Sequence, residues 1–169
     1  MNTPFAALAC ALTLVFAPSP QDPSPARQAA AERFAAALKA TGRTFETTSS
    51  GKSYELPFDH AGAIRRVFVA VNPDEVAGLH VHVVYTDVWS GAEPPDGARM
   101  RTAFTLGKPV GTAYLLQDSK GTWAVRFGVR FDATDLGGRP GAEDPLVKRL
   151  ADVVALVDTV GEELQKALK

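Results

Sequence analysis

The sequence feature that most constrains the fold is the run from Trp123 to Phe131, in which large apolar residues alternate with small or basic ones. Alternation with a period of two is typical of a β-strand that has one buried face. A strand that needs a core on one side only belongs in an antiparallel sheet, because parallel strands are buried on both faces. The predicted inward residues are Trp123, Val125, Phe127, Val129 and Phe131.

The C-terminal segment predicts the partner of that buried face. Asp144 is a good helix N-cap and Pro145 suits the first turn. Apolar residues then recur at three- and four-residue steps as far as Leu168. About 24 helical residues would form a rod of roughly 36 Å, which is long enough to cross a small sheet.

The other segments complete an α+β pattern. The sequence predicts a first helix, capped by Ser24 and opened by Pro25, that ends at Gly42, and a short second helix over 97–106 capped by Asp96. Strands are predicted over 53–58, 64–71, 79–88, 111–117 and 121–132. The order α-β-β-β-α-β-β-α, with hairpin spacing, predicts a five-stranded antiparallel sheet with the helices on one face.

Composition limits the domain count and the class of partner. A chain of 169 residues fits one domain. With 18 Lys and Arg against 19 Asp and Glu, it lacks the basic excess that nucleic-acid binding requires. Cys10 is the only cysteine, which excludes an intramolecular disulfide and a cysteine-rich zinc site.

The N-terminal segment is typical of export. Residues 5–16 carry no charge, but they are too few for a membrane-spanning helix and instead resemble the apolar core of a signal peptide. The alternative is a buried N-terminal helix, since no Lys or Arg precedes this segment. We assign residues 1–26 to a signal peptide and a Pro/Ser linker, and residues 27–169 to one exported domain, periplasmic or secreted, with no transmembrane span after signal removal. Cleavage after Ala17 or after Ala26 stays open, and Cys10 has a poor lipobox before it.

The element order and several local patterns resemble one known family. They are Gly107-Lys108 after the middle helix, the hairpin from Tyr114 to Val125 that turns through 118–121, and the long last helix with Ala151-Asp152 and Val157-Asp158. Over about residues 27–168 the chain resembles the YbjN family, whose fold is that of type III secretion chaperones. The resemblance implies a non-enzymatic protein that binds other proteins, and it makes a second copy of the chain a candidate partner.

The chain departs from that family in two ways. The middle helix is short and begins at Gly97, although in the chaperones this region forms much of the dimer interface. Export is the second departure, because the chaperones and YbjN act in the cytoplasm. The resemblance therefore implies the fold of that family more strongly than its role.

Catalytic motifs are missing from the sequence. There is no GxSxG nucleophile elbow, and Gly51-Lys52-Ser53 lacks the first glycine of a phosphate loop because position 46 is Glu46. We therefore expect no enzymatic activity and no cofactor.

The pair His80-x-His82 has the one spacing typical of metal ligands. Two residues apart on a strand, both imidazoles would share a face and would need a third ligand, for which His60 is a candidate. The alternative is a pair of half-exposed histidines on the open face of the sheet. This pair supports the second functional hypothesis, a metal- or small-ligand-binding envelope protein.

Arg126 and Arg130 support the leading hypothesis. They flank Gly128 on one face of a strand, and we expect that face, shared with His80 and His82, to be a basic surface for an acidic peptide or carboxylate. The alternative is a solvated face on which charge only maintains solubility. Trp89, in a strand-end loop, either packs under that loop or anchors a partner. The leading function is a non-catalytic exported module that binds another protein or peptide through Trp89, Arg126 and Arg130.

Overall fold

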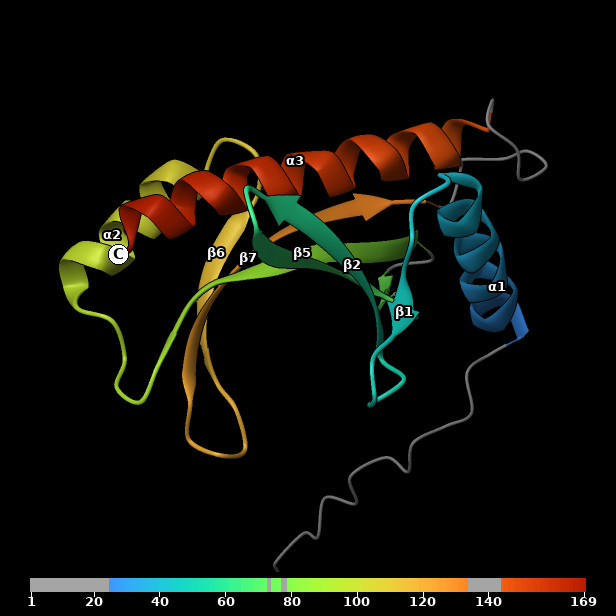
Figure 1. Ribbon diagram of the computed structural model, residues 1–169. Helices are drawn as coiled ribbons and strands as arrows, with labels where there is room; N and C mark the ends of the chain where they lie inside the picture. Colours follow the sequence, from blue (N-terminus) through green and yellow to red (C-terminus); the bar gives the residue numbers. More distant parts are fainter. Residues whose placement is uncertain (1–24, 73, 77–78, 134–143) are drawn as a thin grey trace, which may run out of the picture.

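The computed structural model describes residues 25–72, 74–76, 79–133 and 144–169. They form an α+β fold in which three helices lie over one antiparallel sheet (Figure 1). In chain order the elements are α1 (Pro25–Ala40), β1 (Glu46–Thr47), β2 (Ser53–His60), β3 (Ala63–Ala70), β4 (Asp74–Val76), β5 (Leu79–Gly91), α2 (Gly97–Gly107), β6 (Thr112–Gln117), β7 (Trp123–Asp132) and α3 (Pro145–Ala167). Of the segment predicted as signal peptide and linker, residues 1–24, which include Ser24, lie outside the described residues, and Pro25 and Ala26 belong to the first turn of α1.

The sheet has the order β1-β2-β3-β5-β7-β6, and β4 pairs with β5 beside that path. The prediction of five strands is wrong: the described residues form seven. The two additional strands, β1 and β4, are two and three residues long and pair with β2 and β5. Segments that short cannot show an alternating pattern, which is why the sequence did not predict them. The predicted class and antiparallel pairing are confirmed.

One face of the sheet, which we call the helix face, carries the core. Figure 1 shows α3 running across the sheet between α1 and α2. On α1, the ring of Phe34 stacks on His82 of β5 with the ring centroids 3.6 Å apart. On α2, Gly107 lies against the ring of Phe127 of β7. The fully buried members of this core include Phe34, Leu38, Val67, Val84, Phe127, Leu150, Val154, Val157 and Leu164.

The predicted helix caps are present. Asp144 precedes α3, and its side chain accepts a hydrogen bond of 2.8 Å from the Leu146 N–H. Asp96 precedes α2 and accepts hydrogen bonds from the N–H groups of Ala98 and Arg99. Each cap satisfies backbone donors that the first helical turn leaves without partners, so both helix starts follow from local sequence.

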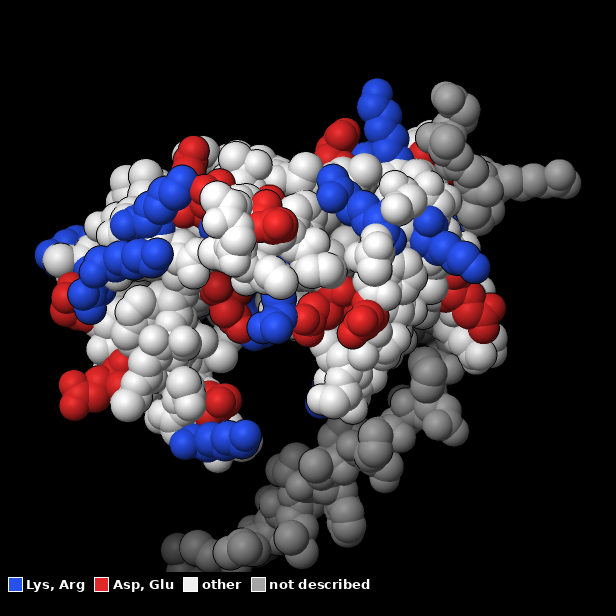
Figure 2. All heavy atoms as spheres, in the orientation of Figure 1, with Lys and Arg blue, Asp and Glu red and all other residues white. Residues whose placement is uncertain are grey.

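The opposite face of the sheet is hollow. In Figure 1 the β6–β7 hairpin and the turn between β1 and β2 extend away from α3 on either side of this face. Figure 2 shows the resulting hollow, with basic and acidic side chains next to each other along its upper rim. We call this surface the concave face. In the described part of the chain, no helix is both long and apolar enough to span a bilayer.

Candidate binding surface on the concave face

Strand register determines which side chains reach the concave face. In β5 and β7, Tyr85 lies opposite Gly128, Val83 opposite Arg130 and Asp87 opposite Arg126. Directly opposed residues of antiparallel strands project to the same face. The same rule adds neighbours from the other strands, namely Ser53, Glu55, Arg66, Phe68, Thr112 and Tyr114.

An aromatic and charged row crosses the middle of this face. Phe68 stacks on Tyr85 with 5.2 Å between the ring centroids. The guanidinium carbon of Arg126 lies 4.0 Å from the centroid of the same tyrosine ring. Asp87 then accepts two hydrogen bonds from Arg126, 2.7 Å from Nε and 3.1 Å from Nη2. A two-point contact of this kind fixes the plane of the guanidinium, so the Arg126 side chain is held in place as part of the structure of this face.

The surroundings of this row shift the pKa values of two side chains, Tyr114 and Arg126. Burial raises the pKa of Tyr114, and the nearby charge of Arg126 only partly opposes that change. For Arg126, burial alone lowers the pKa, but the hydrogen bonds and charge of Asp87 outweigh it, and the net direction is upward. Tyr114 therefore stays a neutral hydrogen-bonding group, and Arg126 stays charged, across the physiological range.

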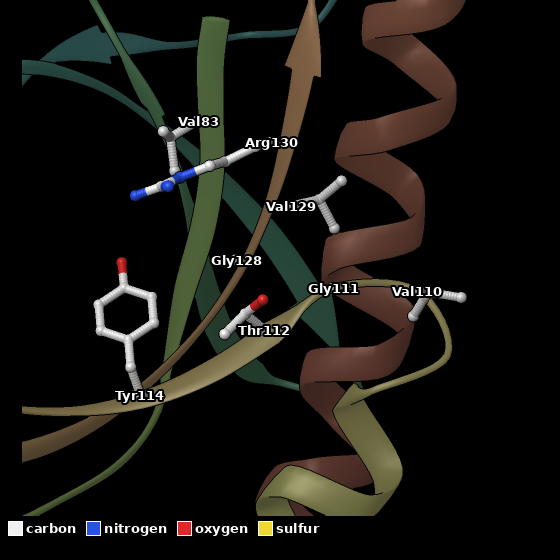
Figure 3. Close-up of a pocket in the computed structure, with 8 residues that line it drawn as sticks. All are labelled: Val83, Val110, Gly111, Thr112, Tyr114, Gly128, Val129 and Arg130. Carbon is white, nitrogen blue, oxygen red and sulfur yellow. The ribbon is translucent and has the colours of Figure 1, made fainter. Parts of the chain in front are cut away.

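A pocket of about 560 Å³ lies where β6 begins, beside β7. Figure 3 shows Val83, Tyr114 and Arg130 projecting to one side of the strands, whereas Val129 projects towards α3 and Val110 lies on the loop that precedes β6. The complete lining is Val83, Val110, Gly111, Thr112, Tyr114, Gly128, Val129 and Arg130. Arg130 is exposed and forms no salt bridge within the described residues. The pocket thus combines apolar walls with one available guanidinium.

Exposed apolar side chains gather near this pocket. Val110 is 40% exposed and Tyr114 is 36% exposed, and both line the pocket. Phe104 of α2 is 49% exposed and lines a smaller hollow of about 190 Å³ that shares Gly111 and Thr112 with it. Exposed apolar groups that adjoin each other in this way are a common mark of an interaction surface.

The structure brings two of the three predicted contact residues together. Arg126 and Arg130 lie on the concave face, as predicted from their spacing. Trp89 lies opposite Val125, so it belongs to the helix face, where it is half-buried and packs against the core. A β-bulge between Asp87 and Trp89 shifts the register there. Trp89 is therefore not part of the concave surface.

The predicted histidine pair is placed differently from the arginines. His82 is 1% exposed and lies opposite Phe131 on the helix face, so the expectation that it shares a face with Arg126 and Arg130 is wrong. The backbone of His80 pairs with Glu75, and its side chain lies outside the description. Among the described residues, no group of three or more potential ligands has a geometry suited to a metal ion.

His60 belongs to a charged cluster that the sequence did not predict. Its Nε2 lies 2.8 Å from an Asp158 carboxylate oxygen, and its Nδ1 lies 3.2 Å from Glu162. Arg65 adds a contact of 3.4 Å to Asp158. The cluster joins the β2–β3 hairpin to α3, and both ring nitrogens of His60 face carboxylates. The available sequence indication was the i, i+4 spacing of Asp158 and Glu162, which places both on one side of a helix.

Comparison with known proteins gives no family assignment. No family model matches the chain, and neither the curated proteins nor the solved structures that were compared include a match.

Proposed function

We propose that this protein is a non-catalytic, exported binding module that takes a protein or peptide on its concave face. The observation that carries the proposal is the pocket beside β7, in which Arg130 has no salt bridge within the described residues and adjoins exposed apolar groups. An exposed guanidinium next to apolar walls suits a ligand that combines a carboxylate with an apolar body. The YbjN-like order of elements favours the same class of function.

The proposal assigns different roles to the two arginines. Arg126 is held by Asp87 and Tyr85, so it shapes the surface and contributes little net charge to a ligand. Arg130 projects into the pocket and is the principal contact for the ligand. The metal-binding alternative would rest on His80 and His82. The tight packing of His82 against Phe34 makes that alternative the weaker of the two, because a metal would have to displace a stacked ring.

Site-specific photo-cross-linking in cells tests the proposal. Tyr114 is replaced by p-benzoylphenylalanine, and the matched control carries the same group at Asp152, an exposed position on α3. We expect a specific adduct from Tyr114 in the envelope or medium fraction, no such adduct from Asp152, and loss of the Tyr114 adduct when Arg130→Glu is added. The same adducts from both positions, or none from Tyr114, would contradict the proposal.

The export part of the proposal has a separate readout. N-terminal sequencing of protein from each cell fraction should find a start beyond residue 17 in the envelope or medium. Intact protein that begins at Met1 and stays in the cytoplasm would refute export and favour a chaperone-like role inside the cell.

A further inference from the structure

We propose that the pocket beside β7 receives the C-terminal residue of a partner polypeptide, with its terminal carboxylate on Arg130 and an apolar side chain against the valines of the lining. The proposal rests on the proposed function and specifies which part of the partner is recognised. Three features carry it: the charge of the lining, a glycine that packing does not require, and the size of the pocket.

The first feature is the charge of the lining. Arg130 is exposed, forms no salt bridge among the described residues, and is the one charged group in the lining of the pocket as described. In contrast, the positive charges of Arg126 and Arg66 on the same face are met by Asp87 and Glu55. The pocket therefore has a positive charge without a counter-charge in its own lining, and a guanidinium can hold a carboxylate by two parallel hydrogen bonds.

Two hydroxyl groups in the lining add neutral hydrogen-bond donors. Thr112 and Tyr114 line the pocket together with Arg130, and Figure 3 shows Tyr114 and Arg130 projecting to the same side of the strands. Burial raises the pKa of Tyr114, so its hydroxyl keeps its proton at neutral pH and can donate it. The two oxygens of a carboxylate offer several acceptor positions, so one carboxylate can accept from a guanidinium and a hydroxyl at the same time.

The second feature is Gly128, which lies inside β7 and lines the pocket. Its φ is not positive, so the backbone there does not need a glycine. A Cβ built on Gly128 would lie 3.4 Å from Tyr85 and 3.8 Å from Tyr114, which are ordinary van der Waals distances, so alanine would fit. Glycine inside a strand weakens it, and often marks a place where a ligand approaches the backbone closely. At this position the missing side chain leaves the pocket open down to the backbone of β7.

The third feature is the size of the pocket. A volume of about 560 Å³ lies in the range of small-ligand sites and suits a short piece of chain rather than a folded surface. Adjacent side chains of an extended chain point to opposite sides, so an internal Asp or Glu and its apolar neighbour would not enter the pocket together. A C-terminal residue carries its carboxylate and its side chain on the same Cα. It can therefore place the carboxylate on Arg130 and the side chain against Val83, Val110 and Val129.

An array of peptides with free C-termini tests this inference. The peptides are attached through a Gly/Ser spacer at their N-termini and cover every combination of the last two residues. They are probed with the purified protein in the form that expressing cells accumulate. We expect the wild type to bind ends whose last residue is apolar, and Arg130→Glu to lose this binding. Arg149→Glu, an equal charge change at an exposed residue of α3, is the control and should keep it.

Fluorescence anisotropy with the best peptide then separates the carboxylate from the rest of the ligand. Replacing the terminal acid by its amide should weaken binding about tenfold. Thr112→Val keeps the shape of an exposed side chain and removes its hydroxyl, so it should weaken the acid more than the amide. Gly128→Ala should be at least as stable as the wild type in urea, because its methyl group fits, yet it should bind the peptide about tenfold more weakly, because that methyl group occupies the pocket. A glycine with a structural role only would not separate stability from binding in this way.

The outcomes distinguish this inference from the proposed function. An array without bound ends, equal binding of acid and amide, or binding that survives Arg130→Glu or is unchanged by Gly128→Ala overturns recognition of a chain end in this pocket. Equal binding of a peptide extended by further glycines would also overturn it, because an internal segment would then suffice. So would displacement of the peptide by isovalerate alone at equal concentration, because the partner would then not need to be a polypeptide. If the Tyr114 cross-link still forms in any of these cases, the binding module stands and only the recognition of a chain end is wrong.

Discussion

Gly161, inside α3, provides a sharp test of how the helix packs on the sheet. An exposed helical Gly→Ala change stabilises a protein by about 1 kcal/mol, because alanine has the higher helix propensity. At Gly161 the new Cβ would lie 2.6 Å from Cγ2 of Thr86 and 3.2 Å from Nη1 of Arg65. Thr86 is fully buried in β5 and its hydroxyl donates a hydrogen bond of 2.8 Å to the Arg66 carbonyl, so it has little freedom to move.

The expected net effect of Gly161→Ala is therefore a loss of stability. Overpacking of a well-packed core costs about 1–3 kcal/mol, which exceeds the propensity gain and leaves a net loss of roughly 0–2 kcal/mol. For a domain of this size, each 1 kcal/mol lowers the melting temperature by about 2–4 °C. Urea unfolding followed by circular dichroism measures the free energy directly. Gly97→Ala is the control, since the nearest atom to its new Cβ is Nη1 of Arg101 at 3.8 Å.

Thr86→Ser identifies the cause of the loss. Serine removes the clashing methyl group and keeps the hydroxyl, so alone it should cost about 1 kcal/mol for the lost buried methyl. In the Gly161→Ala background the same change should instead restore stability, which gives a coupling of about 1 kcal/mol or more. A Gly161→Ala variant as stable as the Gly97→Ala control, or additive effects in the double variant, would refute the packing argument.

Three further predictions concern the caps and the concave face. Asp144→Ala should destabilise the protein by about 1 kcal/mol in urea unfolding through loss of the α3 cap, while Asp152→Ala on the same helix should have little effect. The half-exposed pair of Asp87 and Arg126 should show a coupling of about 0.5–1 kcal/mol in a double-mutant cycle with Asp87→Asn and Arg126→Leu, and additive effects would contradict the two-point contact. Burial raises the pKa of Tyr114 in the folded protein above its value in the unfolded chain. The contribution of the neutral phenol to the free energy of unfolding is therefore complete below the ordinary phenol pKa, and it is lost as the pH rises through the raised value. Tyr114→Phe should remove that alkaline loss from the pH profile of unfolding, as followed by circular dichroism.

The elements with strong local patterns were predictable from sequence. Asp144 and Asp96 mark the starts of α3 and α2 because capping depends on residues within one turn. The alternation of β7 correctly separated Phe127 from Arg126 because large apolar side chains occupy only one of its faces. The same pattern predicted Trp123 as core. It is only half-buried, at the first position of β7.

The orientation of β5 was not predictable in the same way. One face of this strand carries Val81, Val83 and Tyr85, and the other carries His82, Val84 and Thr86. Hydrophobicity alone favours burying the first set, yet the second set is buried. Residues distant in the sequence determine this choice: Phe34 stacks on His82, and Gly161 leaves space for Thr86. A one-residue change of register would reverse every side chain, so the face of a balanced strand is a tertiary property.

The difference between Arg126 and Arg130 follows from the same dependence on register. Both have the same spacing and project to the same face, but β5 presents Asp87 opposite Arg126 and Val83 opposite Arg130. The first arginine therefore gains a carboxylate and a tyrosine ring, and removing it exposes unpaired partners. The second faces an apolar side chain and a pocket, so within the described residues no salt bridge depends on it. Because this arginine lies beside the pocket and forms no salt bridge among the described residues, our proposal gives the ligand contact to Arg130 rather than to Arg126.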